Sequence, residues 1–139
     1  MLEQIHDHIV SELGHSSRTD TIFVITAVLF NLVVLGINSG VAIAAAEEGS
    51  STSNDLILTV FIIMTLLLNI ISVSALILGR RTRGLLLHGL VTMYHDNDVD
   101  KYYDPSLLSN YGTRYVLFTG VIAILALTAI LVPLIIRFV

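Results

Sequence analysis

The chain has 139 residues, of which 55% are hydrophobic and 13% are charged, and its formal net charge is −4. A soluble domain carries about 25% charged residues, so this composition indicates a single membrane domain. The absence of cysteine excludes disulfides and thiolate chemistry, and the modest negative charge argues against nucleic acid as a partner.

Residues 1–19 are predicted to form an amphipathic helical tail. One face of this helix would carry apolar side chains, namely Leu2, Ile5, Ile9 and Leu13. Gly14 would end the helix, because glycine is common just after a helix C-terminus. His8, Glu12 and His15 share a face, but one Glu-x-x-His element is too few for a di-metal bundle. We therefore expect solvated histidines in this tail.

Three apolar runs, residues 21–46, 56–79 and 115–136, contain no Asp, Glu, Lys, Arg or His. Each run is longer than the ~20 residues that a helix needs to cross the ~30 Å hydrocarbon core. Because the backbone in lipid must satisfy its own hydrogen bonds, each run should be a helix. The predicted fold is an all-α integral membrane protein with three transmembrane helices. The acidic start of the chain does not fit a signal peptide, so we expect the first span to be retained.

The first span contains small residues at every fourth position, Gly36, Gly40 and Ala44. Small residues at this spacing allow two helix backbones to approach closely, which favours association in lipid. We predict that this face is the main association face of a homo-oligomer.

Two spans carry uncharged polar residues, which are Asn31, Asn38, Thr65, Asn69 and Ser72. In the favoured interpretation, hydrogen bonds between these side chains join spans one and two, within a subunit or between identical subunits. In the alternative interpretation, the same residues partly line a water-filled path in an oligomer.

Charged residues inside the spans would be expected of a proton relay, a voltage sensor or a coupled transporter. Their absence from all three runs argues against these functions. It also leaves the spans without a catalytic base. We expect no enzymatic activity and no cofactor.

The 47–55 loop has no basic residue and is short, so spans one and two should form an antiparallel hairpin. The following segment, residues 80–114, is predicted to contain an amphipathic helix on an apolar repeat of Leu87, Leu90, Val91 and Tyr94. This helix either continues span two or lies in the membrane interface. Gly84 and Gly89 argue against one straight helix.

Arg80, Arg81 and Arg83 directly follow the second span. The simpler interpretation is that they set the topology and extend their charged ends toward water. The functional alternative is a site for the headgroup of an anionic lipid.

The segment "YHDNDVDKYYDP" at residues 94–105 places Asp96, Asp98 and Asp100 at alternate positions, as in the start of a calcium-binding EF-hand loop. That loop then needs a glycine and a glutamate where this chain has Lys101 and Leu107. A solvated acidic turn is therefore favoured over a cation site. The pair Asp104-Pro105 predicts the start of the third helix.

Six of the seven basic residues lie before the first span or between the second and third spans. The positive-inside rule therefore predicts a multi-pass protein of the cell membrane with a cytoplasmic N-terminus and an outer C-terminus. The leading hypothesis is a non-enzymatic, self-associating membrane protein, with a channel-like homo-oligomer as its sharper form. One alternative is an accessory subunit of a larger membrane complex, and another is a cytoplasmic-face sensor of cations or anionic lipids.

Overall fold

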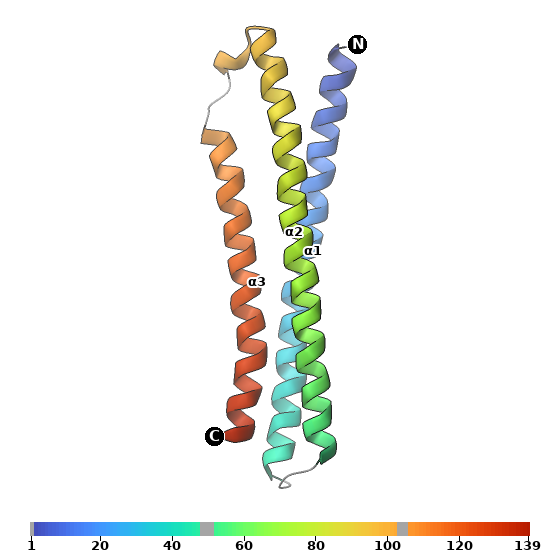
Figure 1. Cartoon of the computed structure of the whole chain (residues 1–139), viewed down its shortest axis with the longest axis vertical. Coiled ribbons are helices and arrows are strands. Elements are labelled where there is room, and N and C mark those ends of the chain that lie inside the picture. Colours follow the sequence, from blue (N-terminus) through green and yellow to red (C-terminus); the bar gives the residue numbers. More distant parts are fainter. Residues whose placement is uncertain (1, 48–51, 103–105) are drawn as a thin grey trace.

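Three long helices make up the structure, a computed structural model that describes residues 2–47, 52–102 and 106–139. They are α1 (Leu2–Glu47), α2 (Thr52–Asp96) and α3 (Ser106–Phe138), with a short 3-10 helix, η1 (Asp100–Tyr102), after α2. Each long helix contacts the other two. The result is an elongated bundle with the N-terminus at one end and the C-terminus at the other (Figure 1).

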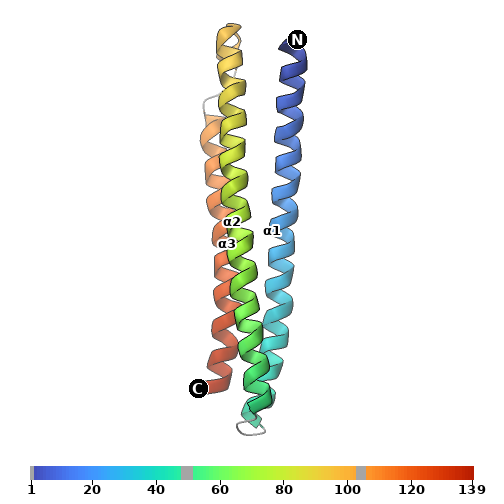
Figure 2. The ribbon, with the colours of Figure 1, turned by 45° about the vertical axis from the view of Figure 1, so that its right-hand side comes forward.

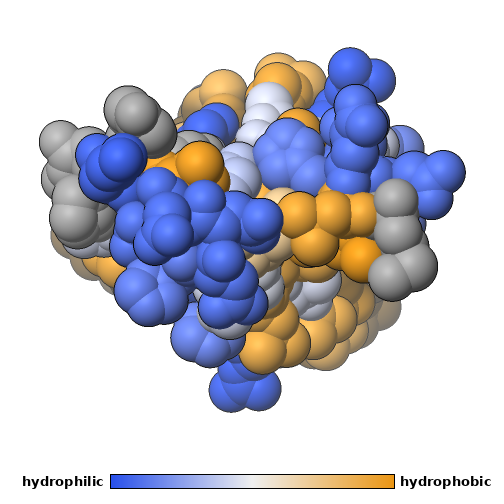
Figure 3. All heavy atoms as spheres, turned by 90° about the horizontal axis from the view of Figure 1, so that it is seen from above, coloured by the Kyte–Doolittle hydropathy of each residue, from blue (hydrophilic) through white to orange (hydrophobic). Residues whose placement is uncertain are grey.

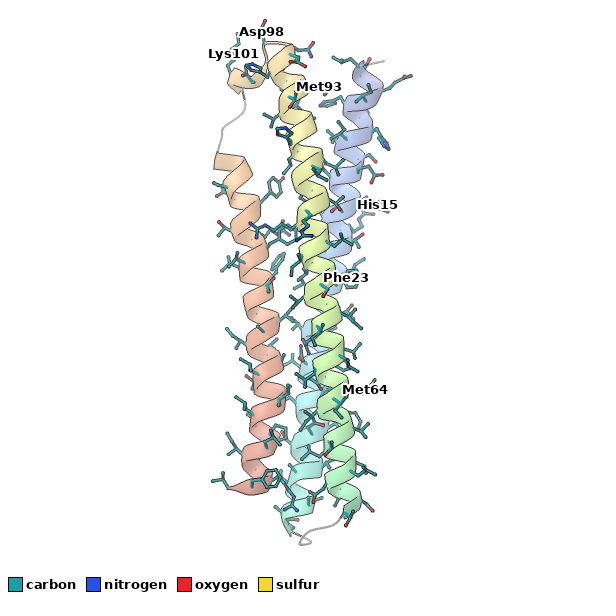
Figure 4. All side chains as sticks on the ribbon, in the orientation of Figure 1. His15, Phe23, Met64, Met93, Asp98 and Lys101 are labelled. Atoms are coloured by element: carbon teal, nitrogen blue, oxygen red, sulfur yellow. The ribbon has the colours of Figure 1, made fainter. Side chains whose placement is uncertain are left out.

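Each long helix contains a stretch that is long and apolar enough to cross a membrane. This confirms the prediction of an all-helical chain with three such helices. Large apolar side chains cover the outside of the bundle, and many are more than 50% exposed, among them Ile22, Leu29, Val33, Ile70 and Ile124. Phe23 and Met64 also project outward from the ribbon (Figure 4). Such a large apolar surface would be unfavourable in water, whereas the acyl chains of a lipid bilayer would cover it.

α1 and α2 are much longer than a membrane span. They have 46 and 45 residues, so each is roughly 68 Å long, against the ~30 Å of a hydrocarbon core. The part beyond the predicted spans consists of residues 2–19 of α1 and residues 80–96 of α2, which we call the polar extension. The two helices run side by side into it (Figures 1 and 2).

The polar extension consists of continuations of the two apolar helices. The sequence predicted a tail helix that ends at Gly14, and it left open whether the helix after span two continues that span. The tail of residues 2–19 is the first part of α1, and Gly14 does not end it. Likewise α2 passes through Gly84 and Gly89 without a break. A glycine in a helix costs only about 1 kcal/mol, and packing against neighbouring helices offsets this, because Leu87 and Leu90 are buried.

Polar side chains gather at the N-terminal end of the bundle, as the view onto that end shows (Figure 3). Asp98 and Lys101 lie there, at the far end of α2 (Figure 4). Near this end the two helices of the polar extension are joined by a hydrogen bond of 3.0 Å between His6 Nε2 and Tyr94 Oη. The extension is thus held by a side-chain contact as well as by apolar packing.

The acidic turn after α2 closes the C-terminus of that helix. Asp98 has a left-handed backbone with φ of 57°. Its amide donates to the carbonyl of His95 at 3.1 Å, and the amide of Val99 donates to the carbonyl of Tyr94 at 3.0 Å. This pair of bonds is the Schellman motif, with Asp98 at the position that glycine usually occupies. The predicted helix start at Asp104-Pro105 lies outside the described residues.

Candidate functional site

The most buried charges of the described chain lie where the apolar segments meet the polar extension. Asp20 of α1 and Arg83 of α2 form an ion pair, with 2.9 Å between Oδ2 and Nη2. Their side chains are only 9% and 4% exposed. Asp20 directly precedes the first apolar run and Arg83 follows the second by four residues, so the antiparallel packing of α1 and α2 brings them together.

Tyr115 joins α3 to this ion pair. Its hydroxyl donates a hydrogen bond to Asp20 Oδ2, and its ring centre is 5.4 Å from the guanidinium carbon of Arg83. The ring of Tyr111, one helical turn earlier, is 5.8 Å from the same carbon. Arg83 Nη2 also lies 3.3 Å from the hydroxyl of Ser16. We call these five residues, Ser16, Asp20, Arg83, Tyr111 and Tyr115, the boundary cluster.

Room for the Asp20 carboxylate comes from Gly79 of α2. A Cβ at residue 79 would lie 2.6 Å from Asp20 Oδ1, closer than any stable contact. The boundary cluster therefore depends on a helical position without a side chain. Because an uncompensated buried charge is strongly unfavourable, the pair favours one register among the three helices.

A second polar contact joins α1 and α2 within the apolar segments. Asn31 Nδ2 donates to Asn69 Oδ1 at 2.8 Å, and Asn69 Nδ2 donates to Asn31 Oδ1 at 2.9 Å. Each amide also donates to the carbonyl four residues earlier in its own helix. The four amide atoms thus have partners inside the bundle, and none needs water.

The three other polar residues that the sequence singled out, Asn38, Thr65 and Ser72, are buried or half-buried. Thr65 is fully buried and Ser72 is half-buried, and both donate to the backbone of their own helix, to Phe61 and Leu68 respectively. Asn38 is fully buried, and neither its Nδ2 nor its Oδ1 has a hydrogen-bond partner among the described residues.

The predicted association face of α1 points away from the other two helices. Gly36 and Gly40 are exposed, and a Cβ on either would have no packing contact within 4 Å. Ala44 is half-buried, because the face turns toward the bundle near the end of α1. Gly36 and Gly40 therefore lie on an open face of α1, whereas Ala44 lies partly against the bundle.

The three arginines after span two have two different environments. Arg80 and Arg81 are exposed, as a headgroup site or a topology signal would require. Arg83 instead points inward and pairs with Asp20. Its position four residues beyond the apolar run places it one helical turn past Gly79, on the face that packs against α1 and α3.

The aspartates of the acidic turn do not gather into one site. Among the described residues there is no group of three or more His, Asp or Glu that could hold a metal ion. Asp100 instead pairs with His95, with 2.9 Å between Oδ2 and Nδ1. The hydrogen bond that the His95 ring donates to this carboxylate raises the pKa of His95 above its ordinary value of 6.5, and the same bond lowers the pKa of Asp100. The cation site at Asp96, Asp98 and Asp100 remains a prediction.

A second ion pair between long helices lies at the opposite end of the bundle. Arg137 of α3 meets the carboxylate of Asp55 of α2 with two nitrogens, at 2.7 Å from Nε and 3.1 Å from Nη2. Arg137 lies in the last turn of α3 and Asp55 in the first turn of α2, where each charge complements its own helix dipole. The bundle is thus joined by polar contacts at both ends and in the middle.

The sequence did not single out four of the residues that form these interhelical contacts, namely Asp20, Tyr115, Asp55 and Arg137.

Comparison of the chain with models of protein families, with curated protein sequences and with solved structures found no match. The function is therefore argued from the residues and their geometry.

Proposed function

We propose that the chain is a non-enzymatic, multi-pass membrane protein that associates with copies of itself through the outward face of α1. The observation that carries this proposal is the contrast between two faces of one helix. Asn31 and Asn38 are buried against the rest of the bundle, whereas Gly36 and Gly40 are exposed, and a Cβ added to either would meet no packing neighbour within 4 Å. In lipid, small residues on an open face favour helix association.

The proposed orientation places the polar extension in the cytoplasm. It carries most of the basic residues near the span ends, including Arg18, Arg80 and Arg81, which the positive-inside rule assigns to the cytoplasmic side. The C-terminus and the 47–55 loop would then lie outside. Cysteine-scanning accessibility in intact cells would test this, since a cysteine at Ser53 should react with an impermeant reagent and one at Ser11 should not.

Self-association is tested by the mass of the solubilised protein. Light scattering in detergent should give a mass of more than one chain for the native protein and of one chain for the double variant Gly36→Leu/Gly40→Leu. The matched control is Ser74→Leu, which enlarges an exposed small residue of α2 and should leave the oligomer intact. A native protein that is monomeric in mild detergent and in lipid nanodiscs would overturn the proposal.

A channel-like assembly is the sharper form of the same hypothesis. It would need polar side chains to face a path between subunits, whereas Asn31, Thr65 and Asn69 are buried within one chain. This burial supports their packing role over a pore. The accessory-subunit alternative would use the same face of α1 for a different membrane protein, and it becomes the better hypothesis if the purified chain is monomeric.

A further inference from the structure

We propose that the groove between α2 and α3 binds one anionic phospholipid, with its phosphate at Arg80 and Arg83 and an acyl chain along α3. The proposal concerns a different face from that used for self-association, and it requires only that the apolar segments lie in a membrane. It rests on two neighbouring cavities and on the charges that line them.

The first cavity is the apolar part of the groove. It has a volume of about 410 Å³ and lies between Leu76 and Ile77 of α2 and the stretch from Tyr115 to Ala123 of α3. The space exists because Thr119, Gly120 and Ala123 are small, and a Cβ on Gly120 would meet nothing within 4 Å. The nine residues from Tyr115 to Ala123 span about 12 Å along α3, which is most of the ~15 Å depth of one leaflet.

The second cavity is smaller and polar. It has a volume of about 190 Å³, and it is lined by Arg80, Arg83, Gly84, Leu87, Tyr111, Gly112 and Tyr115. Arg80 and Tyr115 line both cavities, so the two are adjacent. Arg80 reaches across to α3, since its Nη2 lies 3.6 Å from the place that a Cβ would take on Gly112.

The charge of this polar cavity complements a phosphate. Two arginines line it and no carboxylate does. Asp20 contacts Arg83 from α1 through one nitrogen, Nη2, while the buried Nε of Arg83 has no hydrogen-bond partner among the described residues. Arg80 is exposed and retains its full charge for an incoming anion.

The polar cavity corresponds in position to the headgroup of a lipid, and the apolar cavity corresponds to its acyl chain. Arg80 directly follows the second apolar run, at the level where headgroups lie, and the apolar cavity extends from there into the hydrocarbon region. A free phosphate ion would use only the arginines, and an uncharged lipid would use only the groove. An anionic phospholipid uses both, which is why we assign it as the occupant.

Native mass spectrometry of the purified chain tests this assignment, with phosphatidylglycerol, phosphatidylcholine of the same acyl chains, and inorganic phosphate as probes. We expect one phosphatidylglycerol per chain, bound at least about fivefold more tightly than phosphatidylcholine, since each basic residue near a headgroup contributes about that factor. Arg80→Gln should weaken phosphatidylglycerol binding about fivefold. Gly120→Leu should weaken both lipids, because the added side chain fills the apolar cavity.

Two matched controls separate the groove from general effects. Arg81→Gln removes an exposed charge next to Arg80 that does not line the groove, and Gly89→Leu enlarges an open glycine of α2 elsewhere. Neither should change lipid binding. Equal affinity for the two lipids, equal effects of Arg80→Gln and Arg81→Gln, or displacement of phosphatidylglycerol by inorganic phosphate would each overturn the assignment. Circular dichroism establishes that each variant retains its helices.

Discussion

Asp20 and Arg83, which are 63 residues apart in the chain, form an ion pair of 2.9 Å that is almost completely buried among three helices. The pair lies at the point where the apolar segments end and the polar extension begins. It is completed by the hydroxyl of Tyr115 from α3. Three helices therefore meet at one carboxylate, and the stability of the bundle should be most sensitive there.

Asp20→Asn should destabilise the bundle by about 3–5 kcal/mol, because it leaves the buried guanidinium of Arg83 without a counter-charge. Reversible unfolding in mixed micelles with increasing SDS measures the change. The double variant Asp20→Leu/Arg83→Leu removes both charges and should be less destabilised than Asp20→Asn. The control Arg81→Gln, at an exposed position, should stay within about 0.5 kcal/mol of the native protein. Equal effects of Asp20→Asn and Arg81→Gln would refute the importance of the pair.

Gly79→Ala and Gly89→Ala should have opposite effects on stability. A Cβ at residue 79 would meet the carboxylate of Asp20 at 2.6 Å, whereas a Cβ at residue 89 would meet nothing within 4 Å. Gly89→Ala should therefore stabilise α2 by about 0.5–1 kcal/mol through helix propensity alone. Gly79→Ala should destabilise the bundle despite the same gain in propensity. The same unfolding assay compares them, and a stabilising Gly79→Ala would show that Asp20 does not occupy this space.

Asn31 and Asn69 should be energetically coupled, because each amide donates to the other. A double-mutant cycle of Asn31→Leu and Asn69→Leu should give a coupling free energy of about 0.6–1.7 kcal/mol, the range of side-chain hydrogen bonds within membranes. Each single variant leaves one amide unpaired, so the double variant should be more stable than the sum of the two changes predicts. Strictly additive effects would mean that the two side chains do not pair in lipid.

His95 should titrate above pH 6.5, because its hydrogen bond to Asp100 raises its pKa. The pair therefore stabilises the end of α2 between two titrations: the contribution is lost as the pH rises through the folded pKa of His95, and it is lost as the pH falls through the folded pKa of Asp100. A titration of the His95 ring protons by NMR measures the pKa directly. In Asp100→Asn the pKa of His95 should fall, and an unchanged pKa would remove Asp100 as its cause.

Asp98→Gly should stabilise the C-terminus of α2 by about 0.5–1 kcal/mol, because glycine adopts the left-handed conformation without the steric penalty of a side chain. In this variant, hydrogen exchange should become slower at the backbone amides of residues 98 and 99, which close the last turn of α2. Asp96→Gly is the matched control, since residue 96 is still within α2. It should have the opposite effect.

The three helices follow from the sequence because each apolar run exceeds the length of a span and contains no charge. The continuity of α1 did not follow, because Gly14 was expected to end its first part. The continuity of α2 was one of two alternatives, and Gly84 and Gly89 argued against it. A glycine inside a helix destabilises that helix only slightly, so packing against neighbouring helices determines whether the helix continues through it. Leu87 and Leu90 are buried by such packing; their apolar repeat predicted a helix with an apolar face, but not which helices would cover that face.

The residues that pair between α1 and α2 follow a simple numerical rule, which could have been applied to the sequence. In an antiparallel pair, facing residues are symmetric about the turn, so their numbers have a nearly constant sum. That sum is 100 for His6 with Tyr94 and for Asn31 with Asn69, and 103 for Asp20 with Arg83. Asp20 and Arg83 were therefore recognisable as opposite charges at one level of a hairpin. The role of Tyr115 was not, since it depends on how α3 packs against the other two helices.

The unbroken passage of α1 and α2 from the apolar segments into the polar extension has a mechanical consequence. Residues 2–19 of α1 form an arm about 27 Å long that is rigidly continuous with the first span. Helices adjust to bilayer thickness by tilting, and a tilt of about 10° would swing the tip of such an arm sideways by about 5 Å. A change in the thickness of the membrane would thus be converted into a lateral displacement of the N-terminus.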